Sequence, residues 1–325
     1  MLDNKSRIFV AGAYGFIGYN LTNKLLKEGY KVNGNRFTNK HLKHTHKNYK
    51  ETSYNLEDKA NCIKVLKNID TVFMCAAATS GAFDIVNNPL YHVTSNIRML
   101  LNLLEASIKQ KIKKFVFIST GCVYPDIKKK QFSENDMLKG DPFDVYYSAG
   151  WTKRYSEILC QIFSTKVSKN FSCLIVRPSN IFGPYDKFDK VKSHVTASII
   201  RKVYENQNPL VIWGNGEQKR DLIFIDDFIN GLINVTKKKF DFLEVNIASG
   251  KLYSINEILK FATDLKKTSP KIIYEVNKPK TVDKIQFDIS KIQKIIGFKC
   301  EVSLQEGIKK TFRWIEQNEK IAFTR

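Results

Sequence analysis

Two patterns of hydrophobic residues alternate along the first half of the chain. Short, mostly apolar runs are typical of buried parallel strands, and they occur at Arg7–Ala11, Tyr30–Asn33, Thr71–Ala77, Phe115–Ser119 and Cys173–Val176. Apolar residues three or four positions apart predict helices at Phe16–Glu28, Asn96–Gln110 and Trp151–Phe163. This alternation predicts an α/β fold, with a doubly wound parallel sheet of the Rossmann type.

The alternation of strand and helix patterns becomes irregular after about residue 178. Turn-rich segments at Asn180–Pro184 and Trp213–Gly216 interrupt the pattern. The helices expected here are Val195–Glu205, Ile255–Leu265 and Leu304–Glu316. We therefore expect residues 1–178 to form the Rossmann domain. Residues 179–325 should form mainly a smaller α/β lobe, interleaved with the last part of the sheet.

The charge of the chain is strongly positive. Its 325 residues carry a formal net charge of +21, from 53 Lys and Arg residues against 32 Asp and Glu residues. The lysines are spread along the chain, as at Lys109–Lys114 and Lys237–Lys239, and form no single basic tail with interleaved aromatic residues. We interpret the excess as compositional bias and expect no nucleic-acid or membrane partner, although it would weakly attract an anionic diphosphate.

The six cysteines occur singly, without a C-x-x-C pair or a zinc-type spacing. We therefore expect no metal site and a reducing compartment, because disulfide frameworks belong to oxidising ones. The polar segment Met1–Arg7 has no signal-peptide pattern, and no apolar run reaches membrane-spanning length. The sequence alone thus predicts a cytoplasmic protein.

A glycine-rich turn, with the sequence GAYGFIG, joins the first strand to the first helix. Glycine allows a tight turn and close approach of a pyrophosphate, and the helix start offers free N–H groups and the positive end of its dipole. At the first strand–helix junction of an α/β chain, this pattern predicts dinucleotide binding. We assign to the cofactor site Gly12, Gly15, Phe16, Ile17 and Gly18.

The end of the second strand bears on the choice of cofactor. An acidic residue there would bind the ribose 2′-hydroxyl of NAD, but this region reads Asn33-Gly34-Asn35-Arg36. Arg36 could instead pair with a 2′-phosphate through a forked, charge-assisted contact. This pattern favours NADP, with NAD as the alternative cofactor and a merely solvated Arg36 as the alternative role.

Further motifs follow the later strands in order. They are Ala76-Ala77-Ala78, Ser119-Thr120-Gly121-Cys122-Val123-Tyr124-Pro125, Lys153 on the next helix, Arg177-Pro178-Ser179-Asn180, Trp213-Gly214-Asn215-Gly216 and Arg220-Asp221. Taken together, they resemble the NAD-dependent epimerase/dehydratase family, also called extended short-chain dehydrogenases, from about residue 7 to about residue 300. Within that family the chain most resembles the GDP-L-fucose synthase group.

The resemblance implies roles on the cofactor side of the site. Small residues at Ala76 and Ala77 would let the cofactor lie across the sheet edge, and Pro178 would also contact it. Lys153 would hold the nicotinamide ribose and lower the pKa of a neighbouring tyrosine. Thr120 would hydrogen-bond the sugar hydroxyl or ketone, although a residue there could also simply end a strand.

The resemblance also implies roles on the substrate side. Asn180 would face the sugar nucleotide, and Trp213 and Arg220 would lie near its base and diphosphate. Cys122 and His194 match the base and acid that invert carbons next to a ketone in the synthase group. Each match has a structural alternative, such as a small buried thiol for Cys122, a helix-start residue for His194 and core packing for Trp213.

Family members commonly dimerise through two helices of each subunit. The matching segments here are Asn96–Gln110 and Trp151–Phe163, with the apolar residues Leu100, Leu103, Leu104, Ile158 and Leu159. The resemblance therefore implies a homodimer, and the alternative is that these side chains all face the subunit's own core.

Position 149 departs from the family's Tyr-x-x-x-Lys motif. Four residues before Lys153 stands Ala149, not the tyrosine that serves as acid and base. On a helix, Tyr147 would lie about 240° around from Lys153, and Tyr146 about 10 Å along the axis. Loss of a positioned acid or base typically costs about 10²–10⁴-fold in rate. Inversion beside an existing ketone needs no hydride, only a base, an acid and stabilisation of the enolate.

Three interpretations follow. The first is a nucleotide-sugar epimerase and/or reductase that acts on a GDP-hexose or 4-keto-hexose with a nicotinamide cofactor. The second is a 4-epimerase, dehydratase or dehydrogenase of the same family that acts on a UDP- or dTDP-sugar. The third is a non-catalytic NADP-binding sensor or assembly protein. Ala149 keeps the third open, whereas retention of Thr120, Cys122, Lys153 and His194 favours an enzyme.

Overall fold

The computed structural model describes residue 2 and residues 5–37, 41–78, 89–190, 193–277 and 282–324. Its main sheet has seven strands in the order β10-β6-β5-β4-β1-β2-β3, and every neighbouring pair is parallel. The strands are β1 (Arg7–Ala11), β2 (Lys31–Asn35), β3 (Tyr49–Thr52), β4 (Thr71–Met74), β5 (Lys114–Ile118), β6 (Ser172–Pro178) and β10 (Phe242–Ile247). The predicted α/β fold with a doubly wound parallel sheet is confirmed.

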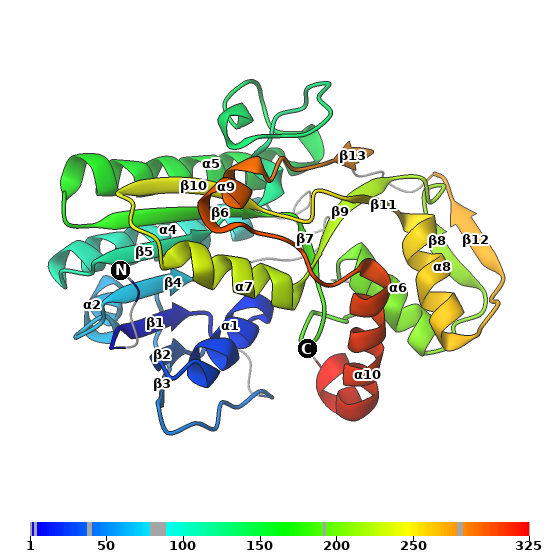
Figure 1. Cartoon of the computed structure of the whole chain (residues 1–325), viewed down its shortest axis with the longest axis horizontal. Coiled ribbons are helices and arrows are strands. Elements are labelled where there is room, and N and C mark those ends of the chain that lie inside the picture. The colour runs from blue at the N-terminus through cyan, green and yellow to red at the C-terminus, as the bar shows by residue number, and fades with distance from the viewer. Residues whose placement is uncertain are drawn as a thin grey trace.

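Helices cover both faces of this sheet (Figure 1). The helices on one face are α1 (Phe16–Lys27) and α7 (Ile225–Thr236), and those on the other are α2 (Lys59–Val65), α4 (Pro89–Lys109) and α5 (Tyr147–Ile162). Successive strand residues point to opposite faces, so Ile8 and Val10 pack with α1, whereas Phe9 packs with α4. Burial on both faces explains why the central strands are nearly continuous apolar runs.

Several of the expected boundaries differ from the structure; helix α4, for example, begins at Pro89 rather than at Asn96, and the helix expected over Leu304–Glu316 continues to Phe323. The strand expected over Thr71–Ala77 ends at Met74, and farther along the backbone of Ala78 pairs with the side chain of Asn96. Helix α5 begins at Tyr147, before the expected Trp151, and so includes Ala149.

Most of the remaining elements form a second group, which lies toward the right in Figure 1. Its strands are β7 (Asn180–Phe182), β8 (Leu210–Trp213), β9 (Lys219–Phe224), β11 (Leu252–Ser254), β12 (Ile272–Glu275) and β13 (Lys284–Ile285). Its helices are α6 (Val195–Tyr204), α8 (Ile255–Lys266) and α10 (Leu304–Phe323), whereas α9 (Ser290–Ile296) packs beside β10 of the main sheet and α7. Strand β9 pairs with β7, β11 and β13, and β8 pairs with β12. Between these elements the chain returns to the main sheet as β10.

Three leucines expected at a subunit interface face the subunit's own core instead. Leu100, Leu103 and Leu104 are completely buried, because this stripe of α4 packs on the strands beneath it. The large apolar side chains exposed on α4 and α5 are others, among them Leu101, Trp151 and Tyr155.

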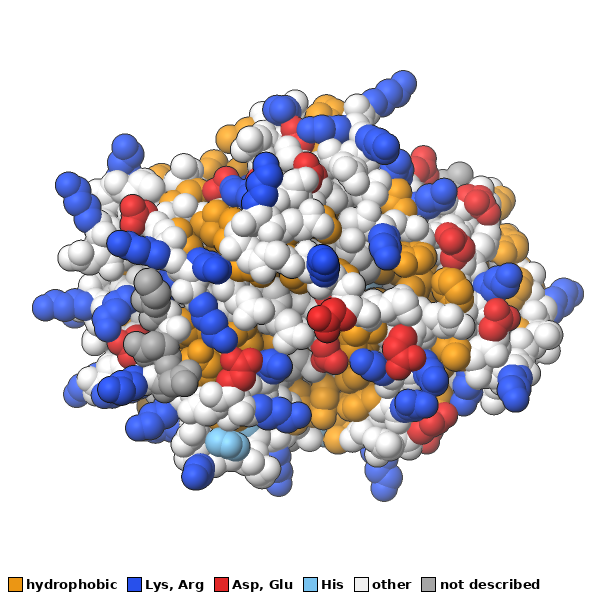
Figure 2. Space-filling view, viewed as in Figure 1, with side chains coloured by type: hydrophobic (Ala, Val, Ile, Leu, Met, Phe, Trp, Pro, Cys, Tyr) orange, Lys and Arg blue, Asp and Glu red, His pale blue; other side chains and the backbone are white. Residues whose placement is uncertain are grey.

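The surface carries both signs of charge. Lys and Arg side chains are spread over the face shown in Figure 2, with Asp and Glu among them. None of the described helices is long and apolar enough to cross a membrane. Within the described ranges, no cluster of His, Cys, Asp and Glu side chains is arranged to hold a metal ion.

Candidate active site

The glycine-rich turn packs directly on the segment that follows β4. Gly12 has a φ of +76°, and a Cβ added to it would lie 2.8 Å from the Cα of Ala76. A Cβ added to Gly18 would lie 2.0 Å from the carbonyl oxygen of Gly12. A side chain at Gly12 would therefore push the turn away from the Ala76 segment, and one at Gly18 would push α1 away from the turn.

The start of α1 fits a pyrophosphate. Gly15 is the N-cap residue and has no side chain to accept the first N–H groups of the helix. The hydrogen bond from Tyr19 N to Gly15 O, at 2.8 Å, closes the first turn and leaves the N–H groups of Phe16 and Ile17 ahead of it. With the helix dipole behind them, these groups could hold the phosphates of a dinucleotide.

Asn96, to which the sequence patterns gave no role, holds the segment after β4 that packs on the glycine-rich turn. Asn96, buried on α4, accepts a hydrogen bond from Ala78 N at 2.8 Å and donates one to Ala78 O at 3.1 Å. It therefore positions the segment that contains Ala76 and Ala77. The only signal in the sequence is an asparagine on the apolar face of a helix.

Arg36 lies beside the glycine-rich turn. Its guanidinium is 3.7 Å from the centre of the Tyr14 ring, and its side chain is only 15% exposed. It donates to both carboxylate oxygens of Glu51, at 3.0 Å each, and to the carbonyl oxygen of Leu42 at 2.9 Å. The alternative of a merely solvated arginine is therefore wrong.

Thr120, Cys122 and Lys153 meet at the carboxyl end of β5. Thr120 caps the short 3-10 turn Gly121–Val123 and accepts from Cys122 N at 3.3 Å. Lys153 reaches the same place from α5, where its Nζ donates to Ile118 O at 2.9 Å. The carboxyl ends of parallel strands are where ligands bind in such sheets, so these three residues are placed for chemistry on a bound ligand.

The surroundings change how these groups titrate. Burial lowers the pKa of Lys153 to about 8, although the negative charge of Glu157 acts in the opposite direction. Burial also raises the pKa of the Cys122 thiol, while a hydrogen bond from Thr120 and the charge of Lys153 oppose that shift. Both residues nevertheless keep some contact with solvent.

The tyrosines near Ala149 do not take its place in α5. Tyr147 is exposed, and its ring lies against that of Trp151, with 6.4 Å between ring centres. Tyr146 lies just before α5 and is half-buried. Its phenol acts to raise the pKa of Arg220, against a larger lowering by desolvation. Tyr146 thus lies toward the residue expected to contact the diphosphate.

His194 is the N-cap residue of α6. Its side chain is exposed, yet desolvation by the surrounding protein and the charge of Lys187 lower its pKa. The contacts in the described part of the chain do not join His194 to Cys122. Lys192, two residues before His194, lies outside the described residues.

The expected substrate residues lie on the second group of elements. Asn180 is on β7, and its side-chain amide donates to Asp221 O at 3.3 Å. Arg220 is on the adjacent β9, where its Nη1 donates to Val282 O at 2.7 Å. Trp213 ends β8 and is 58% exposed, so core packing is not its role. Pro178 is buried at the end of β6.

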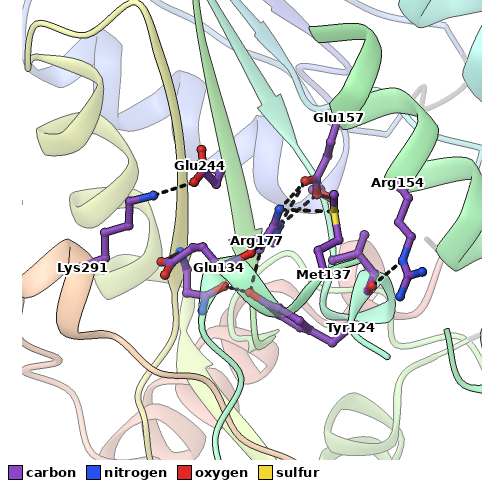
Figure 3. Close-up of polar contacts among 11 residues, drawn as sticks. Tyr124, Glu134, Met137, Arg154, Glu157, Arg177, Glu244 and Lys291 are labelled. Carbon is purple, nitrogen blue, oxygen red and sulfur yellow. Dashed lines mark hydrogen bonds and ion pairs between the residues drawn. The ribbon is translucent and has the colours of Figure 1, made fainter. Parts of the chain in front are cut away.

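A buried polar network supports the floor of the site (Figure 3). Arg177 on β6 pairs with Glu157 on α5 at 2.6 Å and donates to Glu134 O at 2.8 Å. The other carboxylate oxygen of Glu157 accepts from Ser119, and the hydroxyl of Tyr124 donates to Asn246 on β10. Ser119 and Tyr124 flank Thr120 and Cys122, so the network fixes the backbone that carries them.

The comparisons with known proteins agree with this geometry. The model of the NAD dependent epimerase/dehydratase family matches residues 8–248. GDP-mannose 3,5-epimerase 1 of Oryza sativa subsp. indica is 30% identical over 98% of this chain and 84% of its own length. GDP-L-fucose synthase of Escherichia coli K12 is 22% identical, over 97% and 98%. The structure of UDP-glucose 4-epimerase with UDP-glucose from Thermotoga maritima superposes with a TM-score of 0.86 at 25% identity, over 96% and 99% of the two chains.

Proposed function

The chain belongs to the NAD-dependent epimerase/dehydratase family, and from that premise we propose that it is an epimerase and/or reductase of a GDP-hexose or 4-keto-hexose. The observation that carries the proposal is the meeting of Thr120, Cys122 and Lys153 at the carboxyl end of β5. The GDP-sugar relatives support the choice of base.

The proposed chemistry is inversion of a carbon next to a sugar ketone. The Cys122 thiolate removes the proton from that carbon, and the charge of Lys153 stabilises the thiolate. The Thr120 hydroxyl donates to the enolate oxygen as negative charge develops there. His194 returns a proton to the opposite face of the carbon.

The nicotinamide cofactor would be held by the α1 start, by Ala76 and Ala77, and by Lys153 at its ribose. When bound, it supplies hydride exchange with a sugar carbon. We also propose that residues 1–178 carry the cofactor site. Residues 179–325 would carry mainly substrate contacts, through Asn180, Trp213 and Arg220.

A second candidate is a UDP- or dTDP-sugar 4-epimerase, dehydratase or dehydrogenase. The similarity to the UDP-glucose 4-epimerase structure favours it. Incubation with a panel of GDP-, UDP- and dTDP-hexoses, analysed by mass spectrometry and NMR, separates the candidates. Conversion of UDP- or dTDP-sugars alone would contradict the GDP proposal, and conversion of none would favour the non-catalytic interpretation.

We expect NADP(H) to bind at least as tightly as NAD(H), because β2 ends without an acid and Arg36 follows it. Gly15→Asp should weaken binding of either cofactor by at least about 100-fold, since it places an anion beside the pyrophosphate at the α1 start. Calorimetry on the cofactor-free protein measures both affinities. Clearly tighter binding of NAD(H) would contradict the NADP preference, and unchanged binding by the variant would contradict the assigned turn.

We propose a homodimer that packs through the exposed side of α4 and α5. A surface pocket of about 540 Å³ lies there, lined by Val93, Ile97, Tyr147, Ser148, Trp151, Thr152 and Tyr155. Its lining is largely apolar, as expected of the core of a dimer interface.

Tyr155→Glu should convert the dimer to monomer, because it puts a charge on a side chain that is 52% exposed at this surface. Tyr274→Glu, at a similarly exposed tyrosine on β12, is the matched control and should stay dimeric. Sedimentation at micromolar concentration is the measurement. A wild-type protein that sediments only as monomer would contradict the proposal.

A further inference from the structure

We propose that Glu51 determines how strongly this protein discriminates between NADP and NAD, by occupying the guanidinium that would receive the 2′-phosphate. The inference rests on the cofactor site proposed above. It concerns a residue on β3, a strand to which the sequence patterns assigned no role.

A carboxylate on the neighbouring strand pairs with the arginine that follows β2. Glu51 on β3 is the register partner of Gly34 on β2, two residues before Arg36. From there it meets Arg36 in a forked pair, Nε to Oε1 and Nη2 to Oε2, each at 3.0 Å. Arginine binds phosphate with this same two-point geometry. The Nε and Nη2 donors of Arg36 that would bind a phosphate are therefore already bonded to Glu51.

The same carboxylate is tied to the phosphate-binding turn. The hydroxyl of Tyr14, a residue of that turn, donates to Glu51, and Tyr49 OH donates to Tyr14 OH at 3.0 Å. Arg36 lies over the Tyr14 ring, and Nε2 of His44 lies 3.1 Å from Ala13 O in the turn. Glu51 is therefore held within the adenosine side of the proposed site.

The position of Glu51 weakens the binding of NADP more than that of NAD. A 2′-phosphate adds a charge of about −1.5 to −2, and it must compete with Glu51 for Arg36 while being repelled by the carboxylate. NAD has a hydroxyl at that position and adds no charge. The hydrogen bonds from Arg36 and Tyr14 lower the pKa of Glu51, so the carboxylate stays ionised near neutral pH. We therefore expect the wild-type protein to prefer NADP only narrowly.

Removing the charge should widen that preference. In Glu51→Gln, the ratio of the NAD dissociation constant to the NADP dissociation constant should rise on the order of 10-fold, the effect of one charge-assisted hydrogen bond. NAD affinity itself should change little. Calorimetry with both cofactors gives the ratio, and thermal unfolding checks that the variant folds.

Two further variants make the test specific. Arg201 on α6 and Glu205, the C-cap residue of that helix, form another arginine–carboxylate pair, with contacts of 2.8 and 2.9 Å. Glu205→Gln should leave the ratio unchanged. In an Arg36→Leu background, Glu51→Gln should have a smaller effect, because the competition for that guanidinium is gone and only the repulsion by the carboxylate remains. A ratio that stays constant in Glu51→Gln, or that rises just as much without Arg36, would overturn the inference while the cofactor site stands. Binding of neither cofactor by the wild-type protein would overturn both.

Discussion

Replacing Cys122 with Ser should slow solvent deuterium exchange into a 4-keto sugar nucleotide by about 10²–10⁴-fold, the usual cost of losing a positioned acid or base. The thiol lies beside Thr120 and within the field of Lys153, at the end of β5. A serine hydroxyl keeps the size of the side chain but is a far weaker acid, so little alkoxide is available as base. Cofactor affinity should not change, because Cys122 is placed on the sugar side.

His194→Asn should reduce the exchange of solvent deuterium into the inverted position by a similar factor. Burial raises the pKa of Cys122, and desolvation lowers that of His194. The active form, thiolate with imidazolium, is then a minor species whose fraction is constant between the two pKa values. The exchange rate should therefore show a broad plateau across neutrality, falling below the pKa of His194 and above that of Cys122.

The control for these variants is Cys300→Ser. Cys300 is also a half-buried thiol whose pKa burial raises, but it hydrogen-bonds Ala248 O at 3.7 Å in another part of the molecule. That variant should exchange deuterium at the wild-type rate. If Cys122→Ser and His194→Asn both did the same, these residues would be structural and the epimerase mechanism would be wrong.

Installing the missing phenol should raise reductase activity by about 10²–10⁴-fold, the converse of the cost of losing a general acid. Ala149 lies within α5 one turn before Lys153, so a tyrosine there shares a helix face with the ammonium. Ala149→Tyr would place its hydroxyl where Lys153 can lower its pKa. Single-turnover oxidation of NADPH by a 4-keto sugar nucleotide measures the step.

Ala149→Phe is the control for that gain, because it adds the ring without the acidic hydroxyl. It should leave reduction as weak as in the wild-type protein. Equal rates in Ala149→Tyr and the wild-type protein would show that another group already supplies the proton. Tyr146 would then be the first residue to test, because it is a half-buried tyrosine just before α5.

The apolar runs predicted the central strands because those strands are buried on both faces. Strand β3 was missed because its residues, Tyr49–Thr52, are polar and form the edge of the sheet. Strand β8 was missed as well, because the apolar run Leu210–Trp213 is only four residues long. It pairs with β12 outside the main sheet. The role of Asn96 could not be predicted either, because its contact with Ala78 joins two separate segments.

The parts of the site that lie within one continuous segment could be predicted from the sequence. The glycine-rich turn is one such part, and its geometry follows from local backbone rules. Glu51 was not readable, because its partner Arg36 belongs to a different strand and only the β2–β3 register brings them together. Likewise, only the fold identifies Glu157 as the buried partner of Arg177.

The most direct test of the proposed function is incubation of the wild-type protein with a GDP-linked 4-keto-hexose in D₂O. NMR and mass spectrometry then locate any deuterium in the recovered sugar. The account predicts deuterium on carbon next to the ketone, with an inverted product and without net oxidation or reduction of the cofactor. Recovery of the sugar without deuterium, from a protein shown to bind the cofactor, would contradict it.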